Sequence, residues 1–296
     1  MDKLPILEIR EKLIAHKVTV IFIAILAVIL IGGFSFTLKT FFNNQQVVEE
    51  VDLAFDPEGP YALLFPRNDG NALVLNLKRT ASYDLISYEL AYTSLPESGS
   101  VSGDGEGGSG SIDRGVVGNI DTKDKKGEYE QEILFGTCSK NVCKYDKGVQ
   151  NGTLTLHIKK GNKAYRVITQ WHLQKPDVAL GILTSGDNHL VYTVSDKKSL
   201  ANVGYSIVND LTGAPKLPNE KQVLGKVYGL NVPMAKSLPT GNVTVELAEN
   251  PPADAKVFRF NDSTSAWEEL DTKIDGSKLT TSSNGAGIFA VLVPKK

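Results

Sequence analysis

Apolar residues in this chain follow two patterns: one long uninterrupted run near the N-terminus and many short alternating runs after residue 60. The uninterrupted run extends from Val18 to Leu38, reads VTVIFIAILAVILIGGFSFTL and lies between Lys17 and Lys39. At 1.5 Å per helical residue, roughly 20 apolar residues cross the hydrocarbon core of a bilayer. The pattern therefore predicts a single transmembrane helix with its boundaries at Val18 and Leu38.

Basic residues beside the span predict its orientation, because Lys and Arg are retained on the cytoplasmic side. Four precede it, at positions 3, 10, 12 and 17, whereas Lys39 is followed by no other basic residue before Arg67. We therefore expect a cytoplasmic flank at residues 1–17, a single-pass signal anchor in the cell membrane, and an extracytoplasmic remainder. The lipid bilayer is the first expected partner.

Two alternatives to an uncleaved anchor remain open. A cleaved signal peptide would also export the rest of the chain, although this run is long for a signal sequence and residues 32–36 offer no small-x-small cleavage site. A pilin-like N-terminus would carry a glutamate just inside its apolar helix, and this run has none.

Residues 39–60 are polar and contain Pro57, Gly59 and Pro60, which predicts a stalk. Between residues 61 and 175 apolar side chains then alternate with polar ones, which is the period of a half-buried strand. About seven strands are expected, at 61–67, 71–79, 85–94, 113–120, 128–136, 152–160 and 164–174. Seven short strands in this length predict a β-sandwich of immunoglobulin or fibronectin type.

A Gly/Ser-rich stretch at residues 98–111 interrupts this range and is predicted to be a long loop within the first sandwich. Its acidic residues lack the ligand spacing of a calcium loop. Lys175-Pro176-Asp177 marks a domain boundary, and residues 178–296 contain about nine further short strands. The predicted fold class is all-β, with two tandem β-sandwich domains after one transmembrane helix.

The second half resembles a known family. The succession VLGKVYGLNVP, GNVTVELAEN, AKVFRFND, a Trp267-Glu268-Glu269-Leu270 step, KIDGSKLTTSS and GIFAVLV is similar to the β-sandwich module of ankyrins and netrin receptors, which also occurs in prokaryotic surface proteins. The resemblance covers roughly residues 178–294 and departs from the family at Ser195–Leu200. It implies a structural and interaction domain without catalytic residues.

Composition adds one covalent feature and excludes one class of partner. The formal net charge is −2 with a pI near 6.1, so no basic excess indicates binding to nucleic acid. Cys138 and Cys143 are the two cysteines, and their close spacing outside the membrane predicts a disulfide across a hairpin tip. Free thiols or a metal site are the alternatives, but a metal site needs further ligands.

Motifs of catalysis, cofactor binding and metal binding are not evident. His16 belongs to the cytoplasmic flank, His157 and His172 alternate with core positions, and His189 follows a turn. Neither an H-E-x-x-H pair nor a G-x-S-x-G elbow occurs. We therefore expect no catalytic residue, no cofactor and no metal.

The two tryptophans admit two interpretations. Trp171 and Trp267 occupy positions expected in the core, although aromatic rings of this kind also form sugar-binding platforms. The core interpretation is favoured, because Trp171 alternates with apolar core residues.

These features predict a non-catalytic structural or adhesion-type interaction protein of the cell envelope. Its expected partner is an envelope protein or glycan. The alternatives are a carbohydrate-binding surface protein, which requires an exposed aromatic row, and an enzyme, which requires titratable residues that converge in a cleft.

Overall fold

The computed structural model describes residues 49–96, 110–140, 142–174, 181–195 and 204–295. Strands and connecting turns make up these ranges, which confirms the all-β prediction. Within them no helix has the length and apolar character needed to cross a bilayer. The predicted span from Val18 to Leu38, with its flank and residues 39–48 of the predicted stalk, lies outside the described residues.

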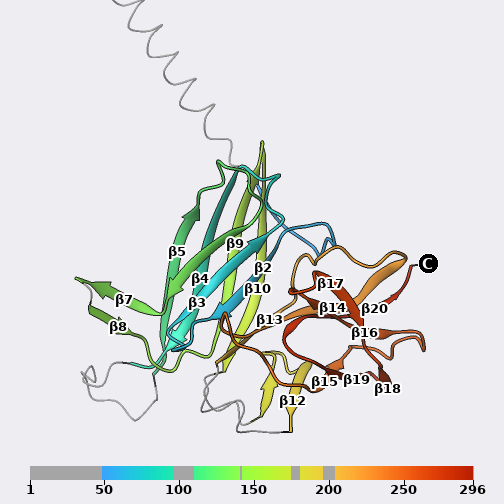
Figure 1. Cartoon of the computed structure of the whole chain (residues 1–296). Coiled ribbons are helices and arrows are strands. Elements are labelled where there is room, and N and C mark those ends of the chain that lie inside the picture. The colour runs from blue at the N-terminus through green and yellow to red at the C-terminus, as the bar shows by residue number, and fades with distance from the viewer. Residues whose placement is uncertain (1–48, 97–109, 141, 175–180, 196–203, 296) are drawn as a thin grey trace, which may run out of the picture. The chain divides into compact units, whose positions relative to one another are not determined.

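One large sheet runs through the molecule (Figure 1). Its strands, in spatial order, are β17 (Ala266–Glu269), β16 (Lys256–Asn261), β20 (Gly287–Pro294), β14 (Lys221–Asn231), β13 (Tyr205–Asn209), β10 (Lys163–Gln174), β9 (Asn151–Lys160), β4 (Leu85–Ser94) and β5 (Ile112–Ile120). A tenth strand, β1 (Glu50–Asp52), pairs with β10 in parallel, so three residues of the range predicted as a stalk are part of this sheet.

Three smaller sheets accompany it. A three-stranded sheet contains β2 (Tyr61–Pro66), β3 (Ala72–Lys78) and β6 (Tyr129–Leu134). A five-stranded sheet contains β11 (Ile182–Thr184), β12 (Leu190–Val194), β15 (Gly241–Glu246), β19 (Lys278–Ser283) and β18 (Lys273–Asp275). A hairpin of β7 (Gly136–Ser139) and β8 (Val142–Tyr145) forms the last pair.

The strands bury the residues that the alternating pattern selects. In β3 the side chains of Leu73, Leu75 and Leu77 are fully buried. In β4 the even-numbered residues are buried while Glu89 and Thr93 are exposed. Because side chains of a strand point to opposite faces in turn, this alternation places one face of β4 on a core and the other in solvent.

Two hydrophobic cores lie on opposite faces of the large sheet. The first core joins β4, β9 and β10 to the three-stranded sheet and contains Trp171 of β10 and Val208 of β13. The second joins the C-terminal strands to the five-stranded sheet and contains Tyr205 and Ile207 of β13. Strand β13 is therefore buried on both faces.

Pairing of β10 with β13 carries the large sheet across the predicted domain boundary. The two strands are antiparallel, and Gln170 lies opposite Asn209. Ser206 of β13 also donates a hydrogen bond to the carbonyl of Leu64 in β2. Strands from 61–175 and from 178–296 thus share one sheet, and residues 50–296 form one compact unit.

The segment 266–275 is divided between two sheets. Its first part is β17 of the large sheet and its last part is β18 of the five-stranded sheet. Between them Thr272 is buried, accepts a hydrogen bond from the amide of Val257 and donates one to the carbonyl of Leu270. This side chain satisfies backbone groups where the chain crosses from one sheet to the other.

Candidate interaction surface

The N-terminal half of the large sheet leaves one face in solvent. This open face consists of the residues of β5, β4, β9 and β10 that alternate with the first core. Val117 is 75% exposed there, and Leu85 and Ile168 are each about half exposed. Polar and charged side chains separate these apolar positions, for example Glu89 and Gln170.

The exposed aromatic row that a carbohydrate-binding surface requires does not occur on the described part of this face. Phe55 and Tyr145 are exposed, but they lie outside β5, β4, β9 and β10. Trp171 is buried as predicted and stacks on Phe135 with ring centroids 5.8 Å apart. Trp267 is partly buried, packs against Phe260 and donates its indole N–H to the carbonyl of Lys216.

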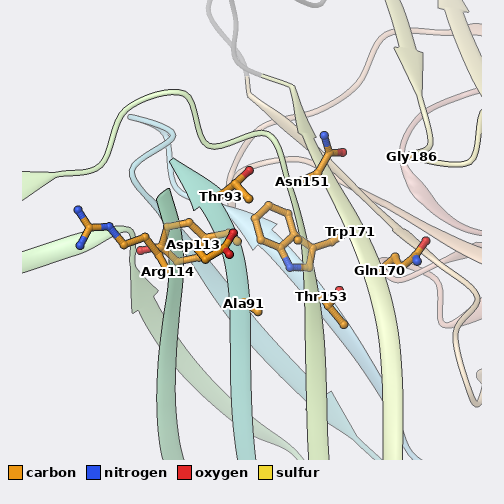
Figure 2. A pocket seen from close by; sticks show the side chains of 11 residues that line it. Ala91, Thr93, Asp113, Arg114, Asn151, Thr153, Gln170, Trp171 and Gly186 are labelled. Carbon is orange, nitrogen blue, oxygen red and sulfur yellow. The ribbon is translucent and has the colours of Figure 1, made fainter. Parts of the chain in front are cut away.

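A polar pocket of about 470 Å³ lies where the open face meets the turn after β11 (Figure 2). Side chains that line it include Thr93, Asp113, Asn151, Thr153 and Gln170, and the turn contributes Gly186. In Figure 2, Asp113 lies toward one end of the pocket and Gly186 toward the other, with Asn151 and Thr153 between them. The lining is mixed, because Tyr92 and Trp171 contribute aromatic surface beside these hydrogen-bonding groups.

His172 lies beside this pocket and is held by one polar contact. Its Nδ1 atom is 2.6 Å from Oδ1 of Asn151, so the neutral ring donates its proton to the amide oxygen. Burial lowers the pKa of His172 below the ordinary value of 6.5, because the charged ring would lose hydration. The predicted solvent-facing histidine is thus half-buried and neutral at pH 7.

Asn209 is a buried amide behind the same turn. It is 2% exposed, and neither its Oδ1 nor its Nδ2 atom has a hydrogen-bond partner. A Cβ atom on Gly186 would lie 3.5 Å from Nδ2 of Asn209. This is an ordinary van der Waals distance, so the turn lies against the amide of Asn209 and has room for a small side chain at position 186.

Asp187 is the centre of the densest polar network among the described residues near the pocket. Its carboxylate accepts hydrogen bonds from Ser185 Oγ at 2.6 Å, from Lys226 Nζ at 3.1 Å and from the Tyr228 hydroxyl at 3.1 Å. The amide of His189 donates to the same group. These contacts close the turn between β11 and β12.

The charge state of this network follows from its surroundings. Burial would raise the pKa of Asp187, but the hydrogen bonds from Ser185 and Lys226 outweigh it and lower the pKa. Burial and the Asp187 charge both raise the pKa of Tyr228, so its hydroxyl stays protonated and donates. Ser185 Oγ also accepts the amide proton of Leu190. Asp187, Lys226 and Tyr228 are therefore engaged with one another in the hydrogen bonds that hold the turn.

The predicted hairpin contains the disulfide. Cys138 of β7 and Cys143 of β8 are register partners joined by an S–S bond of 2.04 Å. Both residues are exposed, as is Val142 beside them. No free cysteine and no group of three potential metal ligands occurs in the described ranges.

The other two described histidines each lie near a carboxylate. His157 forms a contact of 2.8 Å with Glu50 of β1 through Nδ1, and His189 lies 3.8 Å from Asp187. His16, Val18 and Leu38 lie outside the described residues.

A second groove, of about 540 Å³, lies between the three-stranded sheet and β16. Its apolar lining includes Leu63, Phe65 and Phe260, and its rim carries Glu130 and Asp262. Lys78 and Glu128 also line it and form an ion pair of 2.7 Å.

Strand β5 is the terminal strand at one end of the large sheet, and β17 is the terminal strand at the other end. It pairs with β4 along all nine of its residues, and no strand within the described ranges pairs with its other side. Edge strands present unpaired N–H and C=O groups and are commonly protected by lysines, prolines or bulges. The stretch Gly115–Asn119 contains none of these protections. A sequence pattern predicts this strand but not its position at an edge.

No protein-family model, curated protein or solved structure matches this chain.

Proposed function

We propose that this chain is a membrane-anchored, extracytoplasmic interaction protein of the cell envelope that acts without a reaction centre. Residues 18–38 form its anchor, residues 1–17 remain in the cytoplasm, and two β-sandwich units that share one sheet face outward. The observation that carries the proposal is the unprotected edge of β5, which suits the addition of a β-strand from a partner.

Several observations support an interaction role over the alternatives. The described part of the open face carries no row of exposed aromatic side chains. The titratable groups around Asp187 form hydrogen bonds with one another and with the turn. The net charge of −2 does not favour nucleic acid as a partner. An envelope protein that offers an extended segment is the partner class that the β5 edge fits.

The test is capture of envelope components by the full-length chain, compared with a variant whose edge is blocked. Proline lacks the N–H needed for pairing and is tolerated where that N–H faces solvent. The N–H groups of adjacent residues in β5 point to opposite sides of the strand. One of the two variants Val116→Pro and Val117→Pro therefore removes an N–H that points away from β4, and the other removes one that points toward β4. The variant that keeps the parent circular dichroism spectrum and thermal midpoint is used.

Glu89→Lys provides the matched control, because Glu89 is exposed on the open face but belongs to the interior strand β4. We expect a component to be captured by the parent and by Glu89→Lys, and lost with the proline variant. Capture that the proline variant retains, or no capture by the folded parent, would reject the β5 edge as the binding element.

A further inference from the structure

Strand β5, at the edge of the large sheet, has matching residues at its two ends. It reads IDRGVVGNI, with isoleucine at both ends and Asp113 and Asn119 as the second residue from each end, so these four positions are symmetric about Val116. Such a strand can pair antiparallel with a copy of itself, because a two-fold axis brings the same residues together in reverse order.

Alternation of the strand restricts how two copies can pair. Asp113, Gly115, Val117 and Asn119 are exposed on the open face, whereas Val116 packs against the first core. A register that keeps the open faces of both copies on one side must place a residue, not a peptide bond, at the two-fold axis. Odd-numbered residues then lie opposite odd-numbered ones.

Among these registers, the one with Val116 at the axis pairs all nine residues. It places Ile112 opposite Ile120, Asp113 opposite Asn119, Arg114 opposite Gly118, and Gly115 opposite Val117. No two like charges face each other. With Val117 at the axis, Asp113 would face Asp121 of the second copy, and like charges directly opposite destabilise a pair.

We infer that the partner which adds to β5 is a second copy of this chain, paired antiparallel about Val116, so that the large sheets of two molecules continue into one. This inference rests on the proposed function, in which β5 is the binding element. Confinement to one membrane by the proposed anchor would raise the effective concentration of the two edges.

Disulfide trapping in the full-length chain tests the register. Asp113 and Asn119 are exposed, and in the proposed pair Asp113 of one copy lies opposite Asn119 of the other. A mixture of Asp113→Cys and Asn119→Cys chains should form a crosslinked dimer on mild oxidation, whereas either variant alone should not. Each chain in the mixture carries one introduced cysteine, so a disulfide between positions 113 and 119 joins two chains.

Charged side chains introduced at Gly115 and Val117 test how strongly the same two strands associate. A Cβ atom at Gly115 meets nothing within 4 Å, and Val117 is 75% exposed, so both positions accept long side chains in the monomer. In Gly115→Lys/Val117→Lys the lysines face each other twice across the axis, and we expect self-association roughly tenfold weaker. In Gly115→Glu/Val117→Lys each glutamate faces a lysine, and association should return to the parent level or exceed it.

The outcomes separate this inference from the proposed function. Self-association of the charge variants is measured by analytical ultracentrifugation in detergent. A second copy as the partner is supported if the mixture crosslinks while neither cysteine variant does so by itself, and if the lysine–lysine variant associates more weakly than the glutamate–lysine variant. Crosslinking by Asp113→Cys alone, or equal association of both charge variants, overturns the register. A monomeric parent overturns the inference, and if the proline-sensitive capture of another component persists, the proposed function still holds.

Discussion

Trp171 lies directly against the backbone of Gly152, its register partner on β9. A Cβ atom on Gly152 would come within 2.3 Å of the indole ring and 2.2 Å of the carbonyl oxygen of Ala91. Glycine is therefore required for the tryptophan to lie flat over the sheet beneath Phe135. This contact positions the strands that form the polar pocket and the open face.

Gly152→Ala is expected to destabilise the protein, because the added methyl group overlaps both the ring and a strand backbone. Overpacking of this kind costs about 1–3 kcal/mol. Gly115→Ala is the matched control, since a Cβ atom there meets nothing within 4 Å and alanine should leave stability nearly unchanged. Urea unfolding followed by tryptophan fluorescence measures both, and equal midpoints for the two variants would contradict the packing argument.

Asp187→Ala is expected to destabilise the turn between β11 and β12. The substitution leaves the hydroxyl of Tyr228, which is 2% exposed, without its acceptor and removes the partner of Lys226. A buried polar group left unpaired costs about 1–3 kcal/mol.

Asp187→Asn retains one carbonyl acceptor and should lose less stability than Asp187→Ala. Amide hydrogen exchange should show the loss first at Leu190, whose amide donates to Ser185. Unchanged exchange in both variants would mean that the network does not hold the turn.

Stability should fall with acid through His172. Because its pKa is lower in the folded protein than the ordinary 6.5, the unfolded chain binds the proton more readily. The unfolded state is therefore favoured progressively as the pH drops below 6.5, down to the folded pKa.

His172→Gln tests the origin of that slope, since glutamine can donate to Asn151 but does not titrate. Thermal midpoints between pH 7 and pH 5 should decline less in the variant than in the parent. Identical pH profiles would assign the slope to other groups.

The predicted anchor is tested by charges at its centre. Ile25→Arg together with Val28→Arg places two arginines in the middle of the apolar run, and each costs about 2.5–3.5 kcal/mol of insertion. We expect the parent to stay in the membrane pellet after alkaline extraction and the variant to be released. Thr40→Arg, just beyond the span, is the control and should remain in the pellet.

Local pattern was sufficient to predict most strands, because alternation is a property of neighbouring residues. The strand predicted at residues 71–79 buries its alternating residues Leu73, Leu75 and Leu77 together. The Cys138–Cys143 disulfide is expected across a hairpin tip and is found there. Each of these predictions depends on contacts within one strand or one turn.

Relationships between distant strands could not be predicted in this way. Asn209 is opposite Gln170 only because β13 pairs with β10, and nothing in either strand specifies that partner. The pocket combines Asn151 and Gln170 with Gly186 for the same reason. Likewise, the sequence of β5 predicts a strand, but its free side follows from the order of the whole sheet.

The sharing of one sheet by both halves has a consequence for biosynthesis. A ribosome releases β2 and β10 well before β13, yet β13 forms hydrogen bonds with both. The first core includes residues as late as Leu292, so it cannot close until nearly the whole chain has been made. Folding of residues 50–296 is therefore expected to follow the completion of the chain, with an interval in which unpaired strands must be kept apart by chaperones at the site of folding.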